Sequence, residues 1–157
     1  MDFDTGLTDP NKMIELWELS QEATNAHESH ILYNAIRTPD GTVLCSRYRH
    51  DYRVYEDKNG LEYMIDGGLD YLRRNVNKEA PYEELSVTTD ATFELQRTSF
   101  AWGSFGKTGE EKLHYIPLCE MTNEHINAIL DNGYGAKWVR DLFELELKYR
   151  NIKNIND

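Results

Sequence analysis

Arginines and tyrosines stand close together in two short stretches of the chain. The first stretch reads RYRHDYR (47–53), and the second reads DGGLDYLRR (66–74). Guanidinium groups grip phosphate through paired hydrogen bonds, and aromatic rings stack on nucleobases. The two stretches therefore predict a binding site for a small phosphate-bearing ligand.

The predicted site draws on both stretches and on a few residues further along the chain. If residues 47–53 form a strand, Arg47, Arg49 and Arg53 lie on one face, with the tyrosines and His50 on the other. Arginine and lysine side chains are assigned to phosphates, and aromatic rings to a base or ribose. The predicted ligand-binding residues are Arg47, Arg49, His50, Tyr52, Asp66, Tyr71, Arg73, Arg74, Trp102, Lys107 and Arg140.

A second interpretation keeps these arginines out of any site. Residues 37–74 hold seven cations and seven acids, so carboxylates close in sequence match the arginines in number. In this interpretation the arginines form surface ion pairs. Their partners would be Asp51, Glu56, Asp57, Glu62, Asp66 and Asp70.

Two further motifs resemble known signatures only in part. GSFGKTG (103–109) has Gly, Lys and Thr in line, but Gly103 and Gly106 are too close together for a P-loop, and no apolar helix follows. A flexible loop is expected there instead. Asp66, which precedes Gly67-Gly68, is interpreted as a turn residue that bonds nearby backbone amides.

The sequence predicts no catalytic set, no metal site and no cofactor. His50-Asp51 lacks the further histidines and aspartates of a metal phosphohydrolase, and the other histidines look isolated: His27, His30, His114 and His125. There is no G-x-S-x-G motif, and Cys45 and Cys119 lack C-x-x-C spacing. We therefore expect a binding protein in preference to an enzyme.

Composition limits the class of protein. The 157 residues carry a formal net charge of −11, which argues against general binding to DNA or RNA. The chain has no long apolar run, and its first ten residues lack the apolar segment of a secretory signal. We expect a cytoplasmic protein with reduced cysteines and no membrane partner.

The pattern of apolar and turn-forming residues predicts an α+β fold with an N-terminal helix, an antiparallel β-meander and two C-terminal helices. An aspartate and a proline at positions 9 and 10 are typical of a helix start. We expect this N-terminal helix to dock on the body of the protein. TPDGT (38–42) and DKNG (57–60) predict two hairpins within residues 31–66. A short helical turn is expected after Gly67-Gly68.

Downstream, strands and helices are predicted to alternate, and then helices follow one another. The predicted elements are a strand in YEELSV (82–87), a short helix in 90–103, a strand in LHYIPL (113–118), a helix capped by Thr122 that reaches about Asp131 and stops at Gly133, and a last helix at roughly 136–150. The predicted organisation is an acidic helical arm (1–30), a single α+β domain (31–150) and a tail (151–157).

The stretch SRYRHDYRVYEDKNGLEYMIDGGLDYLRR (46–74) resembles a family of small bacteriophage and prophage proteins that share an R-H-D-[YF] … D-G-G-x-x-Y-x-R-R signature. The likeness continues through WGSFGKTGEEKLHYIPLCEMTNEHINAIL and a C-terminal W-V-R-D-L-F helix, and it covers about residues 31–150. Some relatives carry cysteine knuckles where this chain has YEDKNGLEYM, so no zinc site is carried over.

The layout is also similar to the phage sponge proteins that counter the bacterial Thoeris and CBASS defences. Those proteins bind cyclic ADP-ribose isomers or cyclic oligonucleotides at subunit interfaces without cleaving them. The resemblance implies a homo-oligomeric anti-defence protein that sequesters a nucleotide signal in the cytosol of an infected bacterium. Two alternatives stay open: an acidic inhibitor that occupies a basic surface of a host protein, and a cyclic-nucleotide phosphoesterase that uses His50, Asp51 and Asp66.

Overall fold

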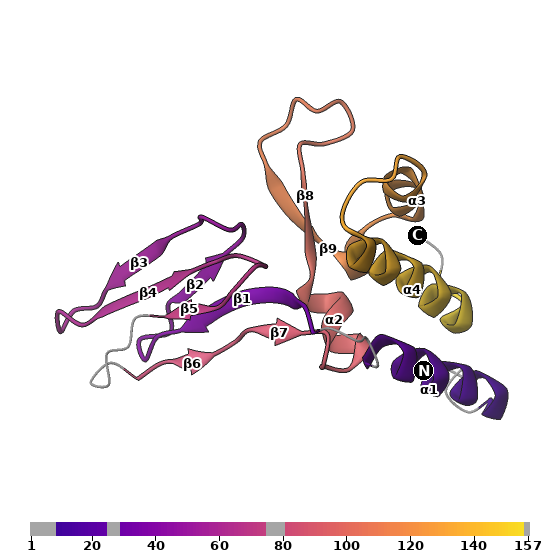
Figure 1. The fold of residues 1–157 in the computed structure, drawn as a ribbon, viewed down its shortest axis with the longest axis horizontal. Helices are drawn as coiled ribbons and strands as arrows, with labels where there is room; N and C mark the ends of the chain where they lie inside the picture. The colour runs from indigo at the N-terminus through magenta and orange to yellow at the C-terminus, as the bar shows by residue number, and fades with distance from the viewer. Residues whose placement is uncertain (1–8, 25–28, 75–80, 156–157) are drawn as a thin grey trace, which may run out of the picture. The chain divides into compact units, whose positions relative to one another are not determined.

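Helices and small antiparallel sheets make up an α+β fold, as the sequence predicts. The structure is a computed structural model that describes residues 9–24, 29–74 and 81–155. The chain divides into two units (Figure 1). Residues 1–27 and 92–157 form the helical unit, and residues 28–91 form the sheet unit.

The N-terminal helix α1 (Pro10–Thr24) begins where its aspartate–proline start predicts. The Asp9 carboxylate accepts a hydrogen bond from the Asn11 amide at 2.9 Å, which satisfies one of the free amides of the first turn. Leu19 is buried, and α1 packs against the last helix, α4 (Lys137–Lys153). The predicted docking of the N-terminal helix is therefore confirmed.

The remaining elements of the helical unit are α2 (Phe93–Ser99), β8 (Ala101–Ser104), β9 (His114–Pro117), the 3-10 helix η2 (Leu118–Glu120) and α3 (Asn123–Asp131). Thr122 caps α3 as predicted, because its hydroxyl accepts a hydrogen bond from the His125 amide at 3.1 Å. The helix predicted over 90–103 is shorter than expected. It stops at Ser99, and the chain continues as β8, which pairs antiparallel with β9.

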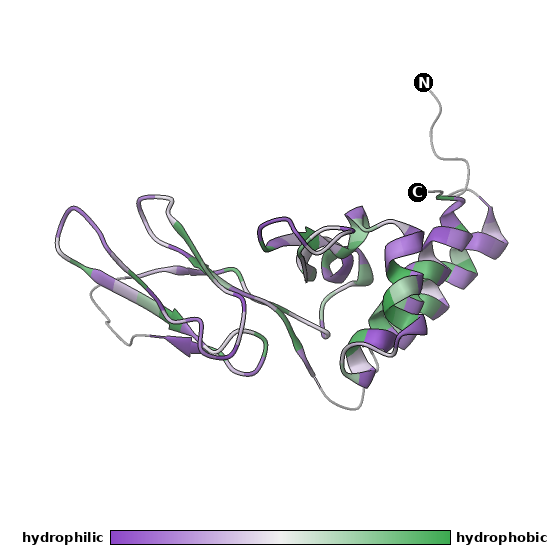
Figure 2. Cartoon of the chain, turned by 90° about the horizontal axis from the view of Figure 1, so that it is seen from above, coloured by the Kyte–Doolittle hydropathy of each residue, from purple (hydrophilic) through white to green (hydrophobic). Residues whose placement is uncertain are grey.

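Aromatic side chains form much of the core of the helical unit. Phe143 of α4 is fully buried, and its ring centroid lies 5.9 Å from that of Phe100 and 5.4 Å from that of Trp102. Phe93 of α2 contacts Tyr149 of α4 at 5.5 Å. These contacts fix α4 against α2 and β8. Figure 2 shows both hydrophobic (green) and hydrophilic (purple) residues along the helices, and none of the helices in the described residues has the length and apolar character that a bilayer crossing requires.

The described residues of the sheet unit contain seven short strands, and all of the pairings between these strands are antiparallel. Strand β1 is central, with β2 on one edge and β6 and β7 along the other, while β3, β4 and β5 form a second sheet (Figure 1). The strands are β1 (Ile31–Arg37), β2 (Val43–Ser46), β3 (Arg53–Glu56), β4 (Glu62–Asp66), β5 (Arg73–Arg74), β6 (Glu83–Glu84) and β7 (Val87–Thr88).

The two predicted hairpins of the sheet unit form, but they lie in different sheets. The β1–β2 hairpin turns at residues 38–42, and the β3–β4 hairpin turns at residues 57–60. Both contribute to one apolar core, in which Ile36, Tyr63 and Ile65 are buried. The strands between residues 31 and 66 are therefore antiparallel as predicted, and they are shared between two sheets that pack on each other.

Two local predictions in the sheet unit are wrong. Strand β2 ends at Ser46 and β3 begins only at Arg53, so residues 47–52 form a loop and not a strand. The Asp51 carboxylate turns the chain there, because it accepts a hydrogen bond from the Arg47 amide at 2.7 Å. The helical turn expected after Gly67-Gly68 is replaced by a turn and by β5, whose residues pair with β4.

Candidate functional site

Two loops of the sheet unit meet at the paired glycines. The first loop, residues 47–52, joins β2 to β3, and the second loop, residues 67–72, joins β4 to β5. Gly68 lies so close to the first loop that a Cβ atom on it would fall 2.3 Å from the carbonyl carbon of Tyr48. Its φ of +53° also lies in the left-handed region. Only glycine fits at position 68, and this glycine lets the backbones of the two loops come into contact.

Two buried polar side chains of the first sheet hold the loops together. The Ser46 hydroxyl donates a hydrogen bond to the Asp51 carbonyl at 2.8 Å and accepts one from the Gly68 amide at 2.9 Å. Asn34 is fully buried on β1. Its side-chain nitrogen lies 3.0, 2.9 and 3.3 Å from the carbonyl oxygens of Asp66, Gly68 and Tyr71. Because an unsatisfied buried carbonyl is destabilising, these bonds hold the second loop in one conformation.

The joined loops expose aromatic and basic side chains to solvent. Tyr48, Tyr52 and Tyr71 are 57%, 56% and 37% exposed, and the Arg73 side chain at the start of β5 is 62% exposed. The turn of the first loop exposes one more arginine and one histidine. We call this set the arginine–tyrosine surface: Tyr48, Arg49, His50, Tyr52, Tyr71 and Arg73. All of these except Tyr48 belong to the predicted site.

The other two arginines of the first stretch, Arg47 and Arg53, stabilise the first loop through their contacts. Asp51 is 4% exposed and accepts hydrogen bonds from the Arg47 amide at 2.7 Å and from Arg53 Nε at 2.8 Å. The Arg47 guanidinium lies over the ring of Tyr33, 5.7 Å from the ring centroid. The ion-pair interpretation therefore holds for Arg53, and Arg47 contributes mainly to the local fold.

Arg74 is also structural, whereas Arg73 is exposed. The Arg74 side chain is 9% exposed and holds Glu84 through two hydrogen bonds of 3.0 and 2.7 Å. Burial disfavours the charge on Glu84, but the bonds from Arg74 outweigh it and lower the pKa of this carboxyl. Arg73 Nη1 forms an ion pair with Asp66 Oδ2 at 3.8 Å, so the ion-pair interpretation also holds for Arg73. The Asp66 carboxylate faces this guanidinium in place of the backbone amides that the sequence predicts. Asp66 Oδ1 is buried without a hydrogen-bond partner among the described residues.

Three predicted site residues belong to the helical unit. Trp102 packs on Phe143 in the core, and Arg140 lies on α4 with its Nε buried. Lys107 lies in the glycine-rich loop after β8 and lines a separate cavity. These residues are therefore not part of the surface that the two loops form.

The arginine–tyrosine surface combines positive charge with aromatic rings. Burial raises the pKa of the Cys45 thiol, and the nearby Arg47 guanidinium only partly opposes this, so the thiol stays protonated at neutral pH. Within residues 9–24, 29–74 and 81–155, no three His, Cys, Asp or Glu side chains are grouped to hold a metal ion. What the surface presents is guanidinium groups and flat rings, the groups that hold phosphates and stack on bases.

The residues that position the loops were not predicted from the sequence. Asn34 stands between apolar residues in the middle of the strand ILYNAIR, and a lone amide at such a position signals a buried hydrogen-bonding role. His114 and His125 are not isolated, although the sequence suggests that they are. Both line the cavity with Lys107, because the chain passes from β9 through η2 directly into α3.

The chain was compared with protein-family models, with curated proteins and with solved structures. None matches.

Proposed function

We propose that this protein binds a small ligand of the nucleotide class at the arginine–tyrosine surface and holds it without cleaving it. The observation that carries the proposal is the contact between Gly68 and Tyr48, which joins the two arginine- and tyrosine-bearing loops. Exposed guanidinium groups would hold the phosphates, and exposed tyrosine rings would stack on the base or ribose.

Local charge supports an anionic ligand at this surface. Arg49 has no ion-pair or hydrogen-bond partner among the described residues, and Arg73 meets Asp66 only at 3.8 Å. Both guanidinium groups therefore keep most of their hydrogen-bonding capacity. The chain as a whole carries a net charge of −11, which repels a long polyanion far more than a small one.

The positions of the carboxylates support binding in preference to hydrolysis. Asp51, which the phosphoesterase alternative requires as a catalytic group, is buried and bonded to the Arg47 amide and to Arg53. A carboxylate held in this way is not free to accept a proton from water or to reach a ligand on the loop surface.

The biological role that we propose is the one implied by the resemblance to phage sponge proteins. In that role the protein sequesters a nucleotide signal, such as a cyclic ADP-ribose isomer or a cyclic oligonucleotide, during infection. Three tyrosines exposed on joined loops form a surface that a second copy of the chain would cover. We therefore propose that the active form is a homo-oligomer with ligand at the subunit interface.

Native mass spectrometry with a mixture of cyclic ADP-ribose isomers and cyclic di- and trinucleotides tests the proposal. The expected result is a ligand-bound oligomer that releases the chemically unchanged ligand when it is denatured by heat. Release of a cleaved product would show an enzyme instead. A protein that captures no compound, at a salt concentration low enough to preserve phosphate contacts, would contradict the proposal.

A second function is favoured by the exposed face of α1. Met13, Ile14 and Trp17 are 53%, 55% and 63% exposed, and three glutamates lie on the same helix. An apolar patch with acidic neighbours suits a protein partner whose groove has a basic rim. This observation supports the acidic-inhibitor alternative.

Capture of a bacterial host protein tests this second function. The Trp17→Ser variant is expected to lose a host protein that the wild type retains at low salt and releases at high salt. Tyr134→Ser is the matched control, since Tyr134 is equally exposed at 60% but lies outside α1. Equal retention by the wild type and the Trp17→Ser variant would exclude the α1 face as the binding surface.

A further inference from the structure

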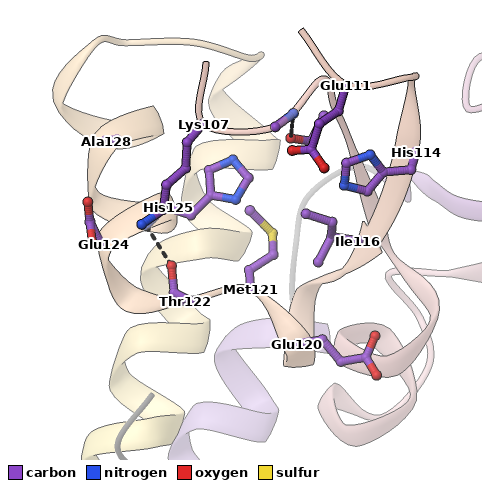
Figure 3. A pocket seen from close by; sticks show the side chains of 12 residues that line it. Lys107, Glu111, His114, Ile116, Glu120, Met121, Thr122, Glu124, His125 and Ala128 are labelled. Atoms are coloured by element: carbon purple, nitrogen blue, oxygen red, sulfur yellow. Dashed lines mark hydrogen bonds between the residues drawn. The ribbon is translucent and has the colours of Figure 1, made fainter. Parts of the chain in front are cut away.

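A cavity of about 520 Å³ opens in the helical unit between the glycine-rich loop, β9 and α3 (Figure 3). Its volume lies within the range of roughly 300–1,000 Å³ that is typical of small-molecule sites. Three segments that follow one another along the chain line different sides of the cavity. They are residues 104–111, residues 114–116 and residues 120–128.

The centre of the cavity combines an apolar floor with basic groups. In Figure 3 the imidazoles of His114 and His125 stand on opposite sides, with Ile116 and Met121 between them. The Lys107 side chain extends from the glycine-rich loop toward His125. Lys107 has no ion-pair partner in the described part of the chain, so its charge is available to a ligand.

His114 is held in a defined tautomer by the loop that precedes it. Its Nδ1 lies 3.0 Å from the carbonyl oxygen of Lys112, and a carbonyl can only accept a hydrogen bond. Nδ1 therefore carries a hydrogen, and Nε2 is the nitrogen left for a ligand. Nε2 accepts a hydrogen bond when the ring is neutral and donates one when the ring is protonated.

Three glutamates also line the cavity, and the carboxylate of one of them, Glu111, lies on the side of His114 in Figure 3. The carboxylate of Glu111 is packed against the loop backbone, since its Oε2 occupies the place where a Cβ on Gly106 would stand. Glu120 and Glu124 lie at the margins in Figure 3. The N-terminal turn of α3, which begins after Thr122, adds partial positive charge on the side of His125.

We propose that this cavity is a second binding site and that it takes a small organic anion, a carboxylate or phosphate ester borne on a compact apolar group. Lys107 holds the anionic group, the two imidazoles flank the ligand, and the apolar body lies on Ile116 and Met121. This site is independent of the arginine–tyrosine surface, because all of its lining belongs to the helical unit.

A matched set of probes tests both the charge and the apolar part of this proposal. Benzoate and phenyl phosphate carry the anion, while benzyl alcohol and benzylamine carry similar rings with no charge or a positive charge. Binding to the full-length protein is followed by NMR through the imidazole signals of His114 and His125. We expect one of the two anions to bind roughly tenfold more tightly than benzyl alcohol, and benzylamine to bind most weakly. The tighter of the two anions identifies the head group.

Two lysine variants show whether Lys107 is responsible. Lys107→Met keeps the length of the side chain and is expected to reduce the anion's affinity to that of benzyl alcohol. Lys112→Met is the control, since Lys112 follows the same loop but does not line the cavity. The proposal would be overturned if all four probes bound with equal affinity or if benzylamine bound most tightly. It would also be overturned if the two lysine variants lost the same affinity for the anion. If Arg73→Ala did not affect nucleotide capture, the proposal for this cavity would still stand, because Arg73 lies in the sheet unit and the cavity lies in the helical unit.

Discussion

Gly68 and Tyr48 are in backbone contact, although one follows β4 and the other follows β2. No side chain fits between them, since a Cβ on Gly68 would fall 2.3 Å from the Tyr48 carbonyl carbon and 2.5 Å from its Cα. This contact explains why DGG stands in a chain segment rich in arginine and tyrosine. The glycines let the second loop lie directly against the first, so that both loops present their side chains together.

Replacing Gly68 by alanine should therefore damage the site through the backbone. We expect Gly68→Ala to lower the free energy of unfolding by about 3 kcal/mol, because the strain of a positive φ adds to a steric clash. Gly41→Ala is the control, since Gly41 also has a positive φ, of +90°, but nothing lies within 4 Å of its Cβ position. That variant should lose only about 1 kcal/mol. Urea unfolding measures both, and equal losses would show that Gly68 is not a steric junction.

Asn34 should be indispensable because it donates to carbonyls of the second loop. Asn34→Asp keeps the shape but replaces the donor nitrogen with an acceptor that faces three carbonyl oxygens. We expect a loss of about 3 kcal/mol or more at neutral pH. The loss should shrink as the pH falls, because protonation removes the buried charge and restores one donor. Urea unfolding at pH 7 and at pH 4 measures the change, with the exposed Asn59→Asp as control. A constant deficit at both pH values would contradict this assignment.

The exposed arginines should carry the affinity for phosphate. We expect Arg49→Ala and Arg73→Ala each to weaken nucleotide binding by roughly 10- to 100-fold, the equivalent of one charge-assisted hydrogen bond. Arg37→Ala is the matched control, since Arg37 is an exposed arginine of the same unit that pairs with Glu83 away from the loops. Isothermal titration calorimetry gives the dissociation constants. If the control loses as much affinity as the two variants, general electrostatics and not a site would account for the binding.

Local sequence signals predicted most of the elements but not how they come together. The start of α1 and the Thr122 cap of α3 were predicted because capping depends on residues within one turn. The hairpin turns at 38–42 and 57–60 were predicted for the same reason. Strand β5 was not predicted, because two residues carry no periodicity and pair only when β4 is already in place.

The sequence predicted which types of residue form the candidate site, but it did not predict which of these residues are exposed and which are structural. Arg74 looks no different from Arg73 in the sequence, yet Glu84 binds one of them and leaves the other exposed. That choice depends on the register of β5, which places the two side chains on opposite faces. Trp102 was assigned to the same site, because the sequence does not show that it packs into the core of the other unit.

The stability of the first hairpin should fall at acid pH through Asp40. Hydrogen bonds from the hydroxyls of Thr38 and Tyr55 hold the pKa of the Asp40 carboxyl well below its usual range. A depressed pKa in the folded state contributes stability above the unfolded value of about 3.9, and that stability is lost as the pH falls through the folded value. Asp40→Asn should therefore be less stable than the wild type at pH 7, with a smaller difference at pH 3. Thermal unfolding across this range measures it, with the exposed Glu144→Gln as control. A difference that does not change with pH would contradict this role for the carboxylate.

The most direct test of the account is to locate a bound nucleotide on the chain. Backbone amide signals of the full-length protein, labelled with nitrogen-15, would be followed during titration with the compound that native mass spectrometry identifies. We predict shifts in residues 47–52 and 67–74, which include both joined loops and β5, and loss of these shifts in the Arg49→Ala/Arg73→Ala double variant. Shifts confined to residues 92–155 would place the nucleotide in the helical unit and contradict the assignment of the site to the arginine–tyrosine surface.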